Sequence, residues 1–237
     1  MNTRKCHQFN RLTSRHTIEI NLLHLFFCLP NPYVYGMEKG RLEAFSDGVF
    51  AIIITIMVLE LKIPQKTDID SLLAQWPVFL GYVLSFVYIG IYWNNHHHTL
   101  QAAESVNGSI LWANMNLLFW LSLIPFVTEW MGVNHFAKLP VTCYGLILIM
   151  NAMAYTILII ALIRHHGRDS LLAKAIGKDT KGYISLAIYA TAIAVSWFNS
   201  TISVVLYGVV ACIWFIPDKR IERRIVGEES PCEKSKV

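Results

Sequence analysis

Two carboxylates flank the first strongly apolar stretch of this chain and are the first residues whose spacing suggests chemistry. Asp47 and Glu60 are separated only by uncharged residues, 48–59. A helix over these residues is about 18 Å long, whereas the hydrocarbon core of a bilayer is about 30 Å thick. A membrane-crossing helix here must hold a carboxylate at membrane depth or at its edge, where charges face a bundle interior or water. The alternative is that Asp47 lies at the membrane interface near a helix N-terminus, where the helix dipole stabilises it.

Three consecutive histidines, His96, His97 and His98, form the second group with chemical potential. Neighbouring side chains on a helix point about 100° apart, so the three rings do not converge on one metal ion. Histidine titrates near neutral pH, which keeps a proton-sensing role open. We favour a structural hydrogen-bonding role over both, and we expect no bound metal and no cofactor.

The composition predicts that a bilayer surrounds the elements that carry these residues. Of the 237 residues, 54% are hydrophobic and 15% are charged, and the mean hydropathy is +0.44. An average soluble protein has about 25% charged residues, so too little charge is present to cover a soluble surface. Disorder is excluded by the same figures. The net charge of +4 comes from basic residues between apolar stretches, which indicates membrane topology rather than nucleic-acid binding. The five cysteines are widely spaced and indicate neither a disulfide framework nor a zinc site.

Six apolar segments predict an all-α membrane protein with six transmembrane helices. The last apolar stretch, 183–216, is too long for one span of about 20 residues, and we divide it at the polar break Phe198-Asn199-Ser200. No strand-like alternation and no glycine-rich phosphate loop is present. The predicted segments are 41–63, 76–98, 110–131, 139–163, 183–197 and 201–216.

The basic residues predict the orientation of these segments. They are concentrated between the fourth and fifth segments and after the sixth, and the opposite side holds only Lys62, Lys66 and Lys138. The positive-inside rule then places both termini in the cytoplasm, which requires an even number of spans. We therefore expect a multi-pass protein of the cell membrane.

The two ends of the chain lie outside the predicted bundle. Residues 1–36 contain an apolar run of about eight residues, too short to span, followed by Pro30 and Pro32. Met37 comes directly before a well-formed helix start, so we interpret 1–36 as a start-site extension or a disordered tail. A signal-like segment is the alternative, although a small-residue cleavage site is missing. We expect a six-helix domain over 37–224 and a disordered cytoplasmic tail over 225–237.

The first segment contains a motif that resembles the R-x-x-x-F-S-D pattern of the transmembrane protein 175 family of potassium channels. Matching positions continue to the end of the sixth segment, and the resemblance covers nearly everything from Met37 to Arg224. Single-repeat bacterial members of this family assemble as homotetramers, and this chain has one repeat. The matching positions are Arg41, Phe45, Ser46 and Asp47, then 58–64, 91–97, Asn116, 123–126 and 216–220.

The resemblance implies a potassium-permeable channel in which the first helix of each subunit lines the pore. Bulky apolar residues then form the constriction, and the matching positions are Ile52, Ile56 and Leu59. Helix geometry agrees, since Ile56 lies 40° and Leu59 20° from Ile52 on either side. Taken alone, such a stripe is more often packing than pore. Thr55 borders the stripe, and its hydroxyl could contact an ion or bond back to its own helix.

The other conspicuous polar residues are expected to anchor this helix to its neighbours. Asp47 lies about 140° around the helix from Ile52, away from the pore stripe. Polar side chains in a membrane bundle pair with one another because lipid cannot satisfy them. The expected network consists of Arg41, Phe45, Ser46, Asp47, Trp93, Asn95, His96, His97 and Asn116.

Two other functions are weighed against the channel. A proton-coupled or secondary cation transporter would need ionisable residues at mid-membrane and usually internal repeats, and mid-membrane charge is nearly absent after the first segment. An intramembrane enzyme built on the histidines and Glu129 lacks a nucleophile–base pair or a ligand set at usable spacing. The expected partners are therefore K⁺ ions, the lipid bilayer and other copies of the chain.

Overall fold

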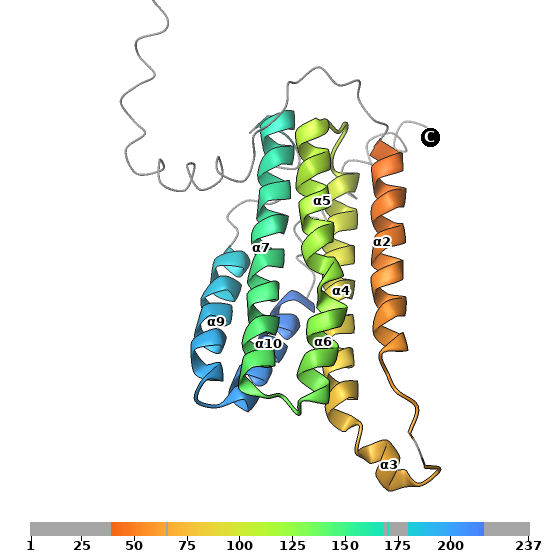
Figure 1. The fold of residues 1–237 in the computed structure, drawn as a ribbon. Helices are drawn as coiled ribbons and strands as arrows, with labels where there is room; N and C mark the ends of the chain where they lie inside the picture. Colours follow the sequence, from red (N-terminus) through yellow and green to blue (C-terminus); the bar gives the residue numbers. More distant parts are fainter. Residues whose placement is uncertain (1–38, 65, 168–169, 171–179, 216–237) are drawn as a thin grey trace, which may run out of the picture. The chain divides into compact units, whose positions relative to one another are not determined.

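Helices make up the regular secondary structure of the described residues, as the sequence predicts. The computed structural model describes residues 39–64, 66–167, 170 and 180–215, which all belong to one compact unit, 35–237. No strand occurs among them. The helices are α2 (Lys39–Leu59), α3 (Ile69–Leu73), α4 (Trp76–Gln101), α5 (Gly108–Ser122), α6 (Ile124–Val133), α7 (Lys138–His166), α9 (Thr180–Ser196) and α10 (Ser200–Phe215) (Figure 1).

Local sequence signals set several of the helix ends. The side chain of Asp68 caps α3 by accepting a hydrogen bond from the amide of Ser71 at 2.8 Å. Asn107 caps α5 in the same way, with the amide of Ile110 as donor at 3.0 Å. Side-chain acceptors at these positions satisfy amides that have no partner within the helix. Gly167 ends α7 with a φ of 90°, a backbone angle that residues with a Cβ rarely adopt.

The third predicted segment consists of two helices. Pro125 lies in the first turn of α6 and has no amide hydrogen, so the α-helical ladder is interrupted near Leu123. The amide of Leu123 instead bonds to the carbonyl of Trp120, three residues earlier, at 3.3 Å. Together α5 and α6 form an apolar stretch, Gly108–Val133, that is long enough to cross a membrane.

Within the described residues, four stretches are long and apolar enough to span a bilayer: α2, α4, the α5–α6 pair and α7. The remaining two, α9 and α10, are shorter apolar helices. Their separation at the polar break is confirmed, because α9 ends at Ser196 and α10 begins at Ser200. The side chain of Asn199 accepts a hydrogen bond from the amide of Thr201 at 3.0 Å, which supports the start of α10.

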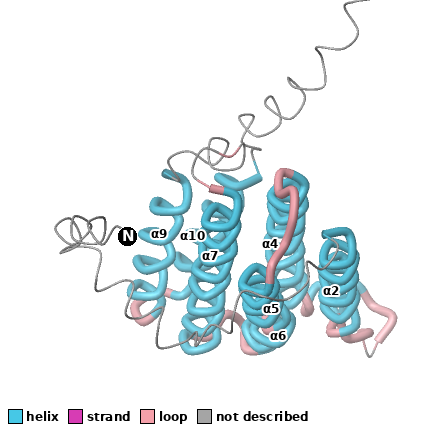
Figure 2. Tube along the Cα trace, turned by 90° about the horizontal axis from the view of Figure 1, so that it is seen from above, coloured by secondary structure: helices cyan, strands magenta, loops and turns pink. Residues whose placement is uncertain are grey.

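Two clusters of buried side chains hold the helices together. The first is formed by α2, α4, α5 and α7, and includes Phe50, Ile89 and Leu117. The second joins α4, α6 and α7 to α9 and α10, and includes Tyr144 and Tyr207. In this unit α2 lies at the edge of the helices and packs mainly against α4 (Figure 2). One face of α2 is therefore left without a neighbour from its own subunit.

Several sequence-based expectations concern residues outside the described ones. The expected extension over 1–36 and the expected tail over 225–237 lie there. So do most of the basic residues that predict the orientation, among them Lys174, Lys178, Lys219 and Arg220.

Candidate functional site

The face of α2 that lies away from its own subunit carries the three aliphatic residues of the expected pore stripe. Ile52 is 57% exposed, Ile56 40% and Leu59 79%. The opposite face contains buried residues, among them Phe50 and Ile53. Because α2 is apolar on both faces and its own subunit covers only one of them, the uncovered face is available to lipid, to another subunit or to a pore.

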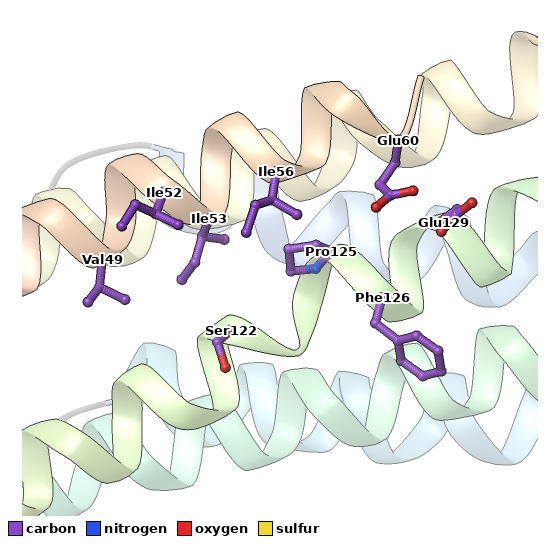
Figure 3. Close-up of a pocket in the computed structure, with 9 residues that line it drawn as sticks. All are labelled: Val49, Ile52, Ile53, Ile56, Glu60, Ser122, Pro125, Phe126 and Glu129. Atoms are coloured by element: carbon purple, nitrogen blue, oxygen red, sulfur yellow. The ribbon is translucent and has the colours of Figure 1, made fainter. Parts of the chain in front are cut away.

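A groove of about 340 Å³ runs between α2 and the α5–α6 pair. Ile52 and Ile56 lie on its α2 side, and Pro125 and Phe126 lie on its α6 side (Figure 3). Leu59 and Thr55 are not part of its lining. The full lining is Val49, Ile52, Ile53, Ile56, Glu60, Ser122, Pro125, Phe126 and Glu129.

Thr55 bonds back to its own helix. Its hydroxyl donates to the carbonyl of Ile52 at 2.9 Å, and the residue is exposed. The sequence left two roles open for this hydroxyl, contact with an ion or a bond to its own helix, and in this structure it makes the bond to its own helix.

Two carboxylates and a lysine meet at the α3 end of the groove. Glu60, directly after α2, and Glu129, on α6, lie at the same end of the groove (Figure 3). The Nζ atom of Lys62 lies 3.5 Å from a carboxylate oxygen of Glu129. The pKa of Glu60 is raised, first by its hydrogen bond with the Glu129 side chain, then by desolvation and by the charge of Glu129, and Lys62 opposes the rise. This end of α2 therefore holds a partly neutralised negative charge.

A chain of buried hydrogen bonds joins α2 to α4 and α5. Asn114 on α5 donates to the hydroxyl oxygen of Ser46 at 2.9 Å, and Ser46 donates to the carbonyl of Leu42 at 2.8 Å. The Nε2 atom of His96 lies 2.7 Å from the Oδ1 atom of Asn114. Since the Asn114 amide nitrogen is the donor to Ser46, its oxygen is the acceptor and His96 carries its proton on Nε2. Ser46 and Asn114 are fully buried and His96 is 1% exposed.

Asp47 has a separate partner on α4. The indole nitrogen of Trp93 donates to a carboxylate oxygen of Asp47 at 3.0 Å. The ring of His97 stacks on Trp93, with the ring centres 5.8 Å apart. Thus Ser46, Asp47, Trp93 and His96, all selected from the sequence, lie in contacts between α2 and its neighbours.

Four of the expected network residues do not take part, through their side chains, in the hydrogen bonds between α2 and its neighbours. Arg41 is exposed and makes no hydrogen bond or ion pair within the described part of the chain, and Phe45 is 51% exposed. The Asn95 side chain donates to the carbonyl of Ile91 on its own helix at 2.9 Å. Asn116 is half-buried, and no hydrogen bond of its side chain occurs among the described residues.

The residue that sequence reasoning missed is Asn114. It lies about 200° around the helix from Asn116, so only one of the two can face α2 and α4. The available signal was the apolar pattern of α5, because Asn114 shares the buried face with Ile110, Leu117 and Leu121. Among the described residues, no three His, Cys, Asp or Glu side chains are close enough together to hold a metal ion.

Long apolar helices joined by buried hydrogen bonds between helices define a multi-pass membrane protein. The sequence profile described as "Endosomal/lysosomal potassium channel TMEM175" matches residues 41–125, which extend from α2 to the start of α6. The chain belongs to this TMEM175 family, which is a family of ion channels and not a class of enzymes.

Relatives from bacteria match most of the chain. A protein of Chryseobacterium sp. (strain P1-3), named a potassium channel, is 58% identical over 189 residues, which cover 80% of this chain and 98% of that protein. A potassium channel of Chamaesiphon minutus is 33% identical over 183 residues and covers 70% of this chain and 88% of that protein. The crystal structure of a lysosomal potassium-selective channel TMEM175 homolog from the same organism matches with a TM-score of 0.65 and 31% identity, covering 75% of this chain and 96% of that one.

Proposed function

We propose that this protein is a potassium-permeable channel that conducts passively through a pore lined by α2 from each of four identical subunits. The observation that carries the proposal is the aliphatic stripe Ile52, Ile56 and Leu59, exposed on a membrane-length helix whose opposite face is buried. The names of the two bacterial relatives support the choice of ion. The tetramer follows from the family resemblance.

In the proposed constriction, the diameter of the apolar ring and the water that it admits control the passage of ions. Four Ile52 side chains around a fourfold axis remove or squeeze the water around a passing ion, and Ile56 and Leu59 extend the apolar lining. A ring of this kind conducts while it is wide enough to stay wet and closes by dewetting when it narrows. Glu60 lies at one mouth of the proposed pore, where its negative charge concentrates cations. The neighbouring side chains of Lys62 and Glu129 change the size of this charge.

The hydrogen bonds on the other side of α2 fix the ring diameter. Ser46 and Asp47 tie α2 to α5 and α4, and these bonds lie on the side of the helix away from the stripe. Because a bundle cannot exchange these bonds for bonds to lipid, they hold α2 at a fixed distance from the axis. In this proposal the six apolar helices all cross the cell membrane, and both termini are cytoplasmic.

Bilayer recording of the purified full chain tests the proposal against a cation transporter. A channel gives unitary current steps in symmetric potassium chloride without a coupling ion or a pH gradient. A transporter gives no unitary steps, and its flux requires the second ion gradient. Vesicle flux that depends on a proton gradient, with silent bilayers, would contradict the channel.

A further inference from the structure

Two histidines at the end of α7 bind the segment between α4 and α5, residues 102–107, through their ring nitrogens. The Nε2 atom of His166 lies 3.1 Å from the amide nitrogen of Glu104 and 3.3 Å from that of Ser105. Backbone amides only donate, so this ring nitrogen is the acceptor and carries no proton. The other ring nitrogen, Nδ1, lies 3.0 Å from the carbonyl of Leu162 and is the donor. His166 is therefore bound as the neutral ring.

His165 is also bound as the neutral ring. Its Nδ1 atom lies 3.1 Å from the amide nitrogen of the Asn107 side chain. Asn107 cannot turn its amide around without losing the cap of α5, because its oxygen accepts from the amide of Ile110. Nδ1 of His165 is thus an acceptor, and Nε2 carries the proton that is donated to the hydroxyl of Ser105 at 3.0 Å.

We propose that His165 and His166 form a clasp on residues 102–107 that protons release, and that its release changes the current through the channel. A proton on Nδ1 of His165 or on Nε2 of His166 would replace an acceptor by a donor. The amides of Glu104 and Ser105 and the side chain of Asn107 would then each face a donor and lose their bonds. Proton binding therefore favours the open clasp, so acidification opens it.

The clasp is connected to the proposed pore helix. The Nζ atom of Lys39, the first residue of α2, donates to the carbonyl of Gln101 at 3.0 Å, directly before the clasped segment. The same segment ends in the cap of α5, the helix that binds Ser46 through Asn114. Opening the clasp loosens both attachments of α2 at this end. With cytoplasmic termini, this is the cytoplasmic end of the protein.

Groups of both signs lie on the elements around the two rings. The backbone carbonyls at the C-terminus of α7 favour a positive charge, and Glu104 on the clasped segment does the same. Arg164 opposes it from α7, and Lys39 is paired with Glu43 at 3.7 Å on α2. Among the described residues, the titratable and charged side chains on the neighbouring elements at this end include Glu104, Arg164, Lys39, Glu43, His98 and Lys181.

Amide hydrogen exchange of the full chain in lipid nanodiscs tests the clasp without any measurement of current. Protection is obtained by correcting exchange for its intrinsic pH dependence. We expect the protection of the Glu104 and Ser105 amides to be lower at pH 5.5 than at pH 7.5, because a proton on Nε2 of His166 removes the acceptor of both bonds. In His166→Gln, the side-chain oxygen accepts from the same amides and does not titrate, so protection should not depend on pH. His135→Asn, at an exposed histidine in the turn after α6, should respond like the unmodified protein.

The clasp's effect on current rests on the proposed channel function, and two measurements test them separately. Hydrogen exchange tests the clasp, and current recordings test the channel and its link to the clasp. Equal protection at both pH values, or an undiminished pH response in His166→Gln, overturns the clasp. A current that changes with cytoplasmic pH in the unmodified protein and not in His166→Gln supports the link to conduction, and a current that is insensitive to pH overturns that link. The absence of current at every pH contradicts the channel, while the exchange experiment still decides the clasp.

Discussion

Replacing Asn114 by leucine removes the side chain that joins α5 to both α2 and α4. Leucine has the same branched shape and the same number of side-chain heavy atoms as asparagine, so the change deletes hydrogen bonds without opening a cavity. Asn114 is fully buried, and it bonds to Ser46 at 2.9 Å and to His96 at 2.7 Å. The substitution leaves the Nε2 proton of His96 without an acceptor in a site that water does not reach.

The expected loss of stability is about 1–3 kcal/mol. Hydrogen bonds between helices in membranes contribute about 0.6 kcal/mol each, so the two bonds together contribute about 1.2 kcal/mol. A buried donor left without a partner costs about 1–3 kcal/mol. The unpaired N–H group of His96 therefore accounts for most of the expected loss of stability. Ser46 loses less, because its hydroxyl still donates to the carbonyl of Leu42.

The free energy of unfolding in mixed micelles of increasing denaturing detergent measures this loss. Asn116→Leu is the matched control, since Asn116 lies on the same helix and has no hydrogen bond among the described residues, and its effect should stay within about 0.5 kcal/mol. Combining Asn114→Leu with His96→Leu should recover about 0.6–1.7 kcal/mol as coupling. Equal effects of the two asparagine variants, or strictly additive effects of the double variant, would refute the reasoning.

Three further substitutions test other parts of the structure. Gly145→Ala places a methyl group against the Tyr207 hydroxyl and 2.8 Å from Ile193 Cγ1, and should cost about 1–3 kcal/mol in the same unfolding assay. Gly90→Ala, which meets no atom within 4 Å, should be neutral or stabilising by up to about 1 kcal/mol, and a larger loss there than at Gly145 would contradict the packing. Glu129→Gln removes the main cause that raises the pKa of Glu60, so Glu60 should lose its proton at a lower pH than in the unmodified protein. Carbon NMR of labelled glutamate carboxyls during a pH titration measures this, and an unchanged midpoint would exclude contact between the two carboxyls.

The helices themselves follow largely from the sequence. Apolar length predicts α2, α4, the α5–α6 pair and α7, because a span needs about 20 apolar residues. The polar break at Asn199 correctly divides α9 from α10, since the side chain of Asn199 starts the second helix. The short helix α3 was not anticipated, although Asp68 is a residue type that often caps the N-terminus of a helix.

The polar contacts follow less directly, because they depend on how the helices are rotated about their own axes. Hydropathy gives the length of a span and says little about rotation when a helix is apolar all round. The side chains of Asp47 and Trp93 could be paired from their positions near the ends of neighbouring antiparallel spans. Choosing Asn114 over Asn116 requires the rotation of α5, which the packing of its buried face determines. The ring contacts of His165 and His166 with residues 102–107 could not be derived from spacing, since about 60 residues separate the partners.

The relative permeability to sodium and potassium of Ile52→Ala channels, taken from reversal potentials in mixed salt, shows whether this face of α2 lines the pore. Alanine widens the proposed ring, so sodium permeability relative to potassium should rise above that of the unmodified protein. Val58→Ala is the matched control, because Val58 is also exposed, at 46%, and lies about 240° around α2 from Ile52. Ile54 lies about 200° from Ile52 and packs against the core, so Ile54→Ala should change stability and leave the permeability ratio unchanged. A raised ratio in Ile52→Ala alone is the predicted result, whereas equal ratios in all three variants, or no change in any, would contradict a pore lined by this face of α2.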